Sequence, residues 1–183
     1  MKVHVLRIGH RLVRDDRVTT HAALVSRAFG AEKIYMTGID QSVAKTVSDI
    51  GARWGGSFEV EIVHEWKAVA REWKKNGGTI AHLTMYGVNV DTAMKTLRRK
   101  KKDVLVIIGS EKVPREAYEL ADYNISVGNQ PHSEIAALTI FLDRIFRGKE
   151  FAREFGGGRL RIVPSEKGKV VQEEKRTTAT ATK

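Results

Sequence analysis

An unbroken run of large apolar residues, Val104–Ile108 (VLVII), is the feature that most restricts how this chain can fold. Asp103 and Gly109 bound the run. A strand with apolar side chains on both faces is typical of the middle of a parallel sheet, because helices cover such a sheet on both sides. The run therefore predicts a central parallel strand.

Strand-like and helix-like segments alternate along the rest of the chain. Strands are expected at 2–8, 33–37, 58–63, 79–84, 104–108 and 123–127, and helices at 20–29, from 40–42 to 51–54, at 65–75, at 91–102, after Pro114 and at 133–146. This alternation predicts an α/β fold, a mostly parallel sheet flanked by helices. Ligands of such sheets bind at the carboxyl ends of strands. The loops after Leu83, Ile108 and Val127 follow predicted strands, so we expect them to form one site.

The stretch 121–146 combines a short strand, the loop GNQPHSE and a long apolar helix. Gly128 permits a close backbone approach, and Pro131 stiffens the loop. Ser133 or His132 is expected to begin the helix. The helix is apolar nearly all round, which indicates a subunit interface beside a binding loop. An ordinary loop leading into a core helix is the alternative interpretation.

Composition narrows the class of partner. The 183 residues carry a formal net charge of +10, which favours a polyanion, with nucleic acid ahead of an anionic membrane surface. The absence of cysteine excludes disulfides, a thiolate nucleophile and cysteine-based zinc sites. No apolar run has the length of a membrane span, so we expect a cytoplasmic protein without a membrane partner. Residues 1–148 are expected to form one domain, and 149–183 a basic appendage with a turn of helix, one strand and a disordered end.

Common catalytic motifs are missing from the sequence. It contains no GxxxxGK[ST] loop, no GxGxxG after the first strand and no HExxH spacing, so a nucleotide P-loop, a Rossmann site and a zinc hydrolase are not indicated. The serines lack a nucleophile elbow, and no metal site is expected. What remains is a ligand cradle made of loop backbone together with arginines.

Three segments, THAALVSRAFGA, VLVIIGSEKVP and ISVGNQPHSEIAALTIFLDRIF, stand in the order of the three motifs of the SPOUT methyltransferases, and the chain resembles that class over about residues 3–147. The opening LRIGHRLVRDDRVTTHAALVSRAFGA is most similar to the archaeal tRNA (cytidine-56-2′-O)-methyltransferases, which act on the T-loop. The resemblance implies a C-terminal trefoil knot, a homodimer, a tRNA partner and S-adenosylmethionine as the methyl donor. By this similarity the donor contacts Leu83, Gly109, Ser110, Glu111, Lys112, Val113, Val127, Gly128, Asn129, Gln130, Pro131, His132, Ser133 and Glu134.

Arg27 matches the arginine of the first motif of ribose-methylating SPOUT enzymes. Those enzymes carry an asparagine six residues earlier, where this chain has His21. We expect Arg27 to hold the reacting nucleotide and stabilise developing alkoxide charge, and the resemblance suggests that it serves the other subunit's donor. The general base is left open between His21, His132 and a phosphate oxygen.

An RNA-facing patch is expected at Arg7, Arg11, Arg14 and Arg17, which the cations of 98–102 and 144–161 extend. Two alternatives stay open. The enzyme can act on another RNA site, such as an rRNA ribose or a base, or the chain is a non-enzymatic basic RNA-binding module.

Overall fold

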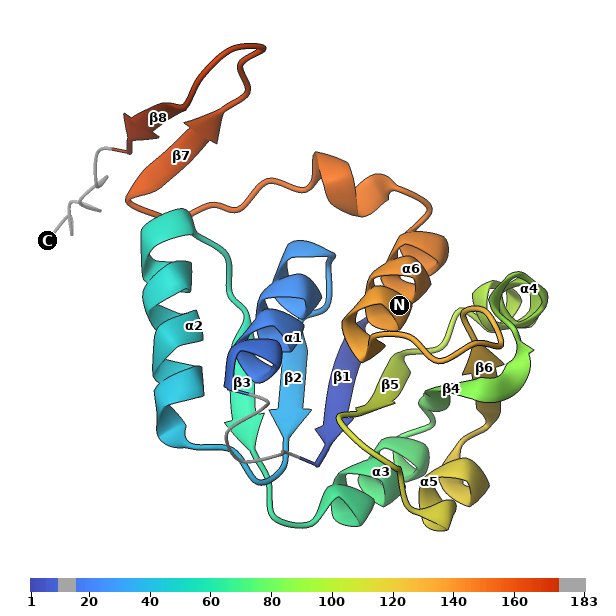
Figure 1. The fold of residues 1–183 in the computed structure, drawn as a ribbon. Coiled ribbons are helices and arrows are strands. Elements are labelled where there is room, and N and C mark those ends of the chain that lie inside the picture. Colours follow the sequence, from blue (N-terminus) through green and yellow to red (C-terminus); the bar gives the residue numbers. More distant parts are fainter. Residues whose placement is uncertain (10–15, 175–183) are drawn as a thin grey trace, which may run out of the picture.

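The computed structural model describes residues 1–9 and 16–174, and for Asp16 it describes the backbone alone. Its main sheet has six parallel strands in the order β3-β2-β1-β5-β4-β6 (Figure 1). The strands are β1 Val3–Ile8, β2 Lys33–Met36, β3 Glu59–Ile62, β4 Thr79–Asn89, β5 Val104–Gly109 and β6 Tyr123–Ser126. The predicted α/β fold with a mostly parallel sheet is confirmed.

Strand β5 lies between β1 and β4 and contains the apolar run that the sequence singled out. Its residues Val104 to Ile108 are all at most 1% exposed. β5 pairs with β1 from Val3 opposite Val104 to Ile8 opposite Gly109. The side chains of β5 alternate between two hydrophobic clusters on opposite faces of the sheet, which is why the whole run is apolar.

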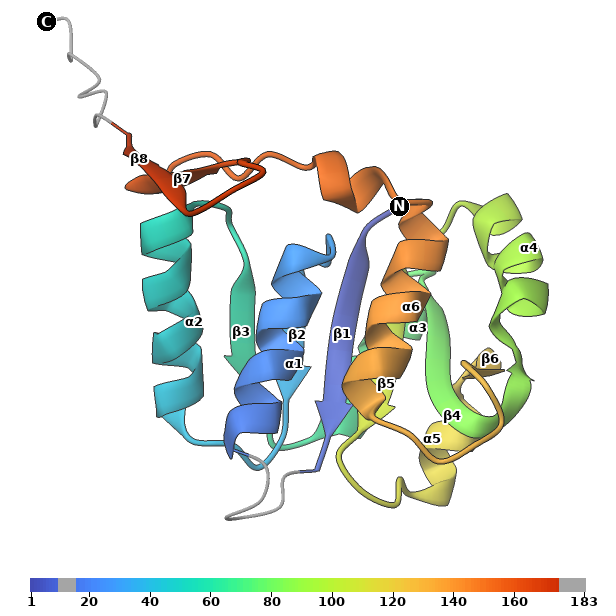
Figure 2. The same cartoon turned by 45° about the horizontal axis from the view of Figure 1, so that its top comes forward.

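The helices form a layer on each face of the sheet (Figure 2). Helices α1 Asp16–Ala28, α2 Gln41–Trp54, α4 Val90–Lys100 and α6 Glu134–Phe146 pack on one face, and α3 Trp66–Lys75 and α5 Arg115–Leu120 pack on the other. Predicted caps are found: the Asp40 side chain accepts from the Ser42 amide, and the Ser133 hydroxyl accepts from the Ile135 amide. No helix among the described residues is long and apolar enough to span a membrane.

Strand β4 is longer than predicted. Its ladder with β6 shifts register between Leu83 and Val88, so the residues between them leave the ladder and the strand then resumes. Gly87 is required there because a Cβ would lie 2.4 Å from the Ile125 nitrogen. Helix α4 consequently begins at Val90 with Asn89 as its N-cap, and the predicted cap at Asp91 is wrong.

The residues after α6 cross the amino ends of the strands (Figure 1). A 3₁₀ turn, η1 Lys149–Ala152, leads to an antiparallel hairpin of β7 Leu160–Val163 and β8 Val170–Glu173. The appendage therefore holds two strands where one was predicted, because β7 finds its partner within the appendage. Disorder was expected over residues 170–183, and this prediction is wrong for Val170–Glu173, which form β8; residues 175–183 lie outside the described residues.

Candidate active site

A pocket of about 810 Å³ opens at the carboxyl ends of β4, β5 and β6. The three loops that were expected to meet do line it, after Leu83, after Ile108 and after Val127. Of the predicted donor contacts it includes Leu83, Gly109, Ser110, Glu111, Lys112, Val113, Val127, Gln130, Pro131, His132, Ser133 and Glu134. Gly128 and Asn129 do not line the pocket.

Asn129 instead fastens two of the loops together. Its Nδ2 donates to the Met85 carbonyl oxygen at 2.7 Å, which joins the loop after β6 to the part of β4 that leaves the ladder. At the third loop, a Cβ on Gly109 would lie 2.1 Å from Val113 Cγ2, so the chain folds back onto the strand end only with glycine there. The pocket walls are therefore held in place by contacts between the loops.

Several residues that line the pocket were not predicted from the sequence: Val18, His82, Thr84, Met85, Tyr86, Ile108, Arg115, Tyr118 and Ala137. Met85 and Tyr86 lie in the part of β4 that leaves the ladder, and Tyr86 is 75% exposed. Arg115 and Tyr118 belong to the short helix α5. Apolar residues in the expected loop after Leu83 were the available signal for Met85 and Tyr86, whereas Val18 reaches the pocket only through the tertiary packing of α1.

His82 is fully buried below the pocket in a polar network. Its Nδ1 lies 2.8 Å from Asn124 Oδ1, while Asn124 Nδ2 donates to the Tyr118 carbonyl oxygen at 3.0 Å. Because the asparagine oxygen accepts, the proton of the neutral imidazole resides on Nδ1. Burial lowers the pKa of His82 below the ordinary value of 6.5. The ring is thus a neutral support for the strand ends.

His132 was one of the rival bases. Its Nδ1 lies 3.0 Å from the Ser133 carbonyl oxygen, and its Nε2 lies 2.5 Å from the Val127 carbonyl oxygen. Both ring nitrogens therefore lie against backbone acceptors of the loop itself rather than being free for a substrate hydroxyl. The contacts favour a role for His132 in bracing the loop.

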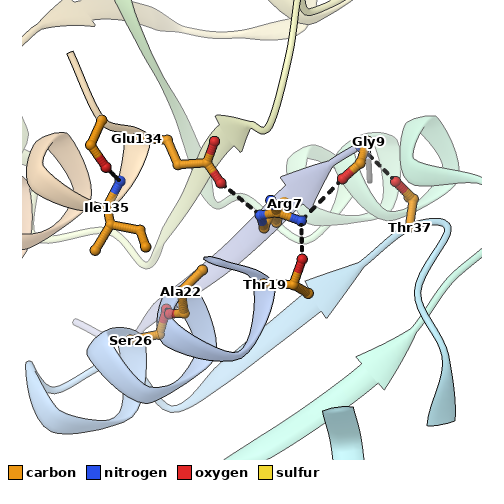
Figure 3. A network of polar contacts seen from close by, with 9 residues as sticks. Arg7, Gly9, Thr19, Ala22, Ser26, Thr37, Glu134 and Ile135 are labelled. Atoms are coloured by element: carbon orange, nitrogen blue, oxygen red, sulfur yellow. Dashed lines mark hydrogen bonds and ion pairs between the residues drawn. The ribbon is translucent and has the colours of Figure 1, made fainter. Parts of the chain in front are cut away.

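Arg7 does not belong to an RNA-facing surface, and that prediction is wrong. Its side chain is 0% exposed, and its Nε lies 2.7 Å from Glu134 Oε1 (Figure 3). Arg7 Nη1 also donates to the Gly9 carbonyl oxygen at 3.2 Å and to Thr19 Oγ1 at 2.9 Å. A charge buried this deeply needs such partners. Arg7 therefore joins the end of β1 to the first turns of α1 and α6.

Of the other members of the predicted patch, Arg17 lies in the first turn of α1. Arg17 is exposed, next to Val18 of the pocket wall. Arg11 and Arg14 lie outside the described residues. Arg17 thus retains the surface position that an RNA contact requires.

Arg27 does not reach this pocket within its own chain. It lies about 14 Å further along α1 than Val18, at the other end of the sheet. Its guanidinium donates to the Gly55 carbonyl oxygen and lies over the Phe155 ring, 4.7 Å from the centroid. With Arg153 it lines a separate cavity of about 470 Å³. These contacts attach the appendage to the end of α2.

No group of three or more histidine or acidic side chains among the described residues is arranged to hold a metal ion. The lining of the pocket combines loop backbone and apolar side chains with two carboxylates, Glu111 and Glu134.

Comparison with known proteins gives close relatives along nearly the whole chain. The tRNA (cytidine(56)-2′-O)-methyltransferase of Cenarchaeum symbiosum is 53% identical over 94% of this chain and 98% of its own. The protein of the same name from Methanocaldococcus jannaschii is 54% identical over 96% of this chain and 98% of its own.

Solved structures share the fold at much lower identity. An RNA 2′-O ribose methyltransferase superimposes with a TM-score of 0.60 and 15% identity over 81% of this chain, which spans 57% of that protein. The A. aeolicus TrmH/SpoU tRNA modifying enzyme superimposes with a TM-score of 0.55 and 17% identity. The match covers 82% of this chain and 76% of that protein. AviRb from Streptomyces viridochromogenes, a SpoU methyltransferase solved with AdoMet, superimposes with a TM-score of 0.56 and 17% identity. The match covers 80% of this chain and 57% of that protein.

Residues 54–172 match the family described as tRNA ribose 2′-O-methyltransferase, aTrm56, and this segment holds all three loops that line the pocket. The resemblance read from the sequence motifs is confirmed by the relatives and by the parallel fold. The chain belongs to the aTrm56 family of tRNA ribose 2′-O-methyltransferases.

Proposed function

We propose that this protein methylates the ribose 2′-oxygen of cytidine 56 in tRNA with S-adenosylmethionine as donor, and that it does so in the cytoplasm. One observation carries the proposal: the three loops that the family resemblance assigned to the donor converge on one pocket. The names of relatives that are about half identical over nearly their whole length supply the target nucleotide.

The residues present fit the donor. The pocket volume lies within the usual range for ligand sites. Leu83, Val113 and Val127 offer apolar surface to a purine ring, and loop amides and carbonyls offer its polar edge the partners it needs. The carboxylates of Glu111 and Glu134 suit a ligand with a cationic sulfonium centre. The bound donor supplies an electrophilic methyl group.

The chain itself contributes position and electrostatics. Fixed loops orient the donor against an incoming ribose, and such orientation is a large part of the rate enhancement of a two-substrate reaction. Because the ring nitrogens of His132 face carbonyl oxygens, we assign the hydroxyl proton to a tRNA phosphate oxygen, to water or to His21. Arg17 beside the pocket, with Lys112 and Arg115 in its wall, would hold the tRNA phosphates.

A homodimer is part of the proposal, and the faces of α1 and α6 support it. These helices pack against each other, and on their outward side Ile140 is 40% exposed while Ala136, His21 and Ala28 are exposed as well. A two-fold partner would cover this surface. The catalytic role predicted for Arg27 then requires the pocket of the partner subunit, because its own pocket lies at the other end of α1.

The trefoil knot remains a prediction of the family resemblance. Two observations support it: β4 leaves its ladder between Leu83 and Val88, and Gly87 packs directly against the backbone of β6. A chain that passes through a loop needs such a close backbone crossing.

The decisive experiment is methyl transfer to unmodified tRNA followed by nucleoside mapping. Methylation of cytidine 56 supports the proposal, and methylation elsewhere selects the alternative of another RNA site. Calorimetry with S-adenosylmethionine separates the non-enzymatic module, which would bind tRNA but no donor at millimolar concentration. Sedimentation of wild type and Ile140→Glu tests the dimer, since a charge in the proposed interface should yield monomers.

A further inference from the structure

We propose that the cations at the carboxyl ends of α4 and α6 form a second tRNA-binding surface, at the end of the molecule opposite the donor pocket. This α4–α6 basic surface consists of Arg98, Arg99, Lys100, Lys101, Lys102, Arg144, Arg147 and Lys149. The proposal rests on the function proposed above, because it takes tRNA as the polyanion.

The two segments are far apart in the sequence but adjacent in the fold. Helices α4 and α6 pack against each other, and the Arg98 guanidinium donates to the Arg144 carbonyl oxygen (Figure 2). Neither 98–102 nor 144–149 contains an acidic residue. The charge of Arg144 is partly offset by Asp91 and Asp143, whose carboxylate oxygens lie 3.0 and 3.1 Å from its guanidinium nitrogens. Desolvation lowers the pKa of Arg98, and the neighbouring charges of Arg147 and Arg144 lower it further against the opposing effect of Asp91 and Asp143, so the cations still repel one another. A polyanion would relieve that repulsion.

Cations near helix carboxyl ends have a purely structural explanation, since they interact favourably with the helix dipole. Backbone geometry gives an observation that the helix dipole does not explain. In residues 1–9 and 16–174, the non-glycine residues with positive φ are Lys101 (52°) and Arg147 (63°). They are the C-caps of α4 and α6, where glycine or asparagine is normally preferred because a Cβ is strained in the left-handed region. Both helices thus accept strain at a position that bears a cation on the same surface.

The distance to the pocket suits a large substrate. Helix α6 begins at the pocket with Glu134 and ends at the basic surface with Phe146, and its 13 residues span about 20 Å. A small substrate cannot contact both ends of α6. Folded tRNA is several times longer and carries a phosphate on every nucleotide, so it can place a ribose in the pocket and other phosphates against the basic surface.

The test uses the full-length chain and a double variant, Lys101→Gly with Arg147→Gly. Glycine is the preferred residue at both positions, so the variant should unfold at the same temperature as the wild type or higher. Its Kd for unmodified tRNA, measured by fluorescence anisotropy, should nevertheless rise about tenfold. The slope of log K against log salt should fall by about 1.5, as expected for two lost phosphate contacts. The affinity for S-adenosylmethionine should not change.

The matched control is Arg71→Ala with Lys75→Ala, which removes two exposed cations from α3 on the other face of the sheet. The proposal is overturned if the glycine variant binds tRNA with unchanged affinity and salt slope, or if the control loses as much affinity. A loss of donor affinity in the glycine variant would also overturn it, because the surface would then act through the pocket. Binding is measured without turnover, so absence of methylation by the wild type refutes the proposed function while leaving the test of this surface intact.

Discussion

Replacing Glu134 by leucine should destabilise the protein more than any single exposed charge change. The substitution leaves the Arg7 guanidinium, which is 0% exposed, without the carboxylate 2.7 Å from its Nε. Breaking a buried ion pair from one side costs about 3–5 kcal/mol. Loss of an acidic residue from the first turn of α6 adds roughly 0.3–1 kcal/mol. Because Arg7 keeps its bonds to Gly9 and Thr19, we expect the lower end, about 3 kcal/mol.

Urea unfolding and thermal melting measure this loss. For a chain of this length about 3 kcal/mol corresponds to a fall in Tm of roughly 6–12 °C. The matched control is Asp49→Asn, which removes the carboxylate of the Lys45–Asp49 pair, 2.7 Å long with side chains 76% and 66% exposed. That exposed i,i+4 pair should contribute no more than about 0.5 kcal/mol.

A double variant distinguishes the buried charge from lost packing. Arg7→Met with Glu134→Leu replaces the pair by apolar side chains, and such replacements are often neutral or stabilising. It should recover most of the stability lost in Glu134→Leu. If Glu134→Leu destabilises no more than Asp49→Asn, or if the double variant is less stable than Glu134→Leu, the argument from the buried pair is refuted.

Three further changes test other parts of the structure. Gly87→Ala should lower the free energy of unfolding by about 1–3 kcal/mol and also weaken donor binding, because its Cβ would overlap the β6 backbone. Thermal melting and calorimetry with the donor measure the two effects. In the control Gly156→Ala, where nothing lies within 4 Å of the new Cβ, neither quantity should change. Burial lowers the pKa of His82 below 6.5, so the unfolded chain binds the proton more readily than the folded chain. The contribution of His82 to the free energy of unfolding should therefore be complete above pH 6.5 and be lost as the pH falls below it, and buried His4 acts in the same direction. Urea unfolding at pH 7.5 and pH 5 should show a smaller loss of stability at the lower pH in His82→Gln than in the wild type. Arg27→Ala should abolish methyl transfer with donor affinity intact if Arg27 serves a partner's pocket, whereas a lower Tm with transfer preserved would assign it to holding the appendage.

Much of the fold follows from local patterns in the sequence. The run Val104–Ile108 is apolar because both faces of β5 are covered, and that required no knowledge of its neighbours. Helix limits were likewise readable from Asp40 and Ser133, whose side chains accept hydrogen bonds from amides two residues away. The three loops could be assigned to one site because the carboxyl ends of parallel strands share an edge.

Errors arose where a side chain takes its role from a distant segment. Arg7 looks like a surface cation in the sequence, and only the approach of Glu134, 127 residues later, explains its burial. The catalytic role of Arg27, which fits a family motif, stays a prediction, and its contacts with Phe155 of the appendage could not be read from the sequence either. The extension of β4 depends on the backbone of β6, which no pattern within 79–89 reveals.

The pairing of β1 with β5 bears on how the protein is made. Val3 lies opposite Val104, so the first strand has no partner on that side until more than a hundred residues have left the ribosome, which at about 5–20 residues per second takes several seconds. During that time β1 can pair only with β2, its other neighbour in the sheet. Contacts between such distant segments slow folding, so we expect the sheet to close late in synthesis and the nascent amino end to need protection from aggregation.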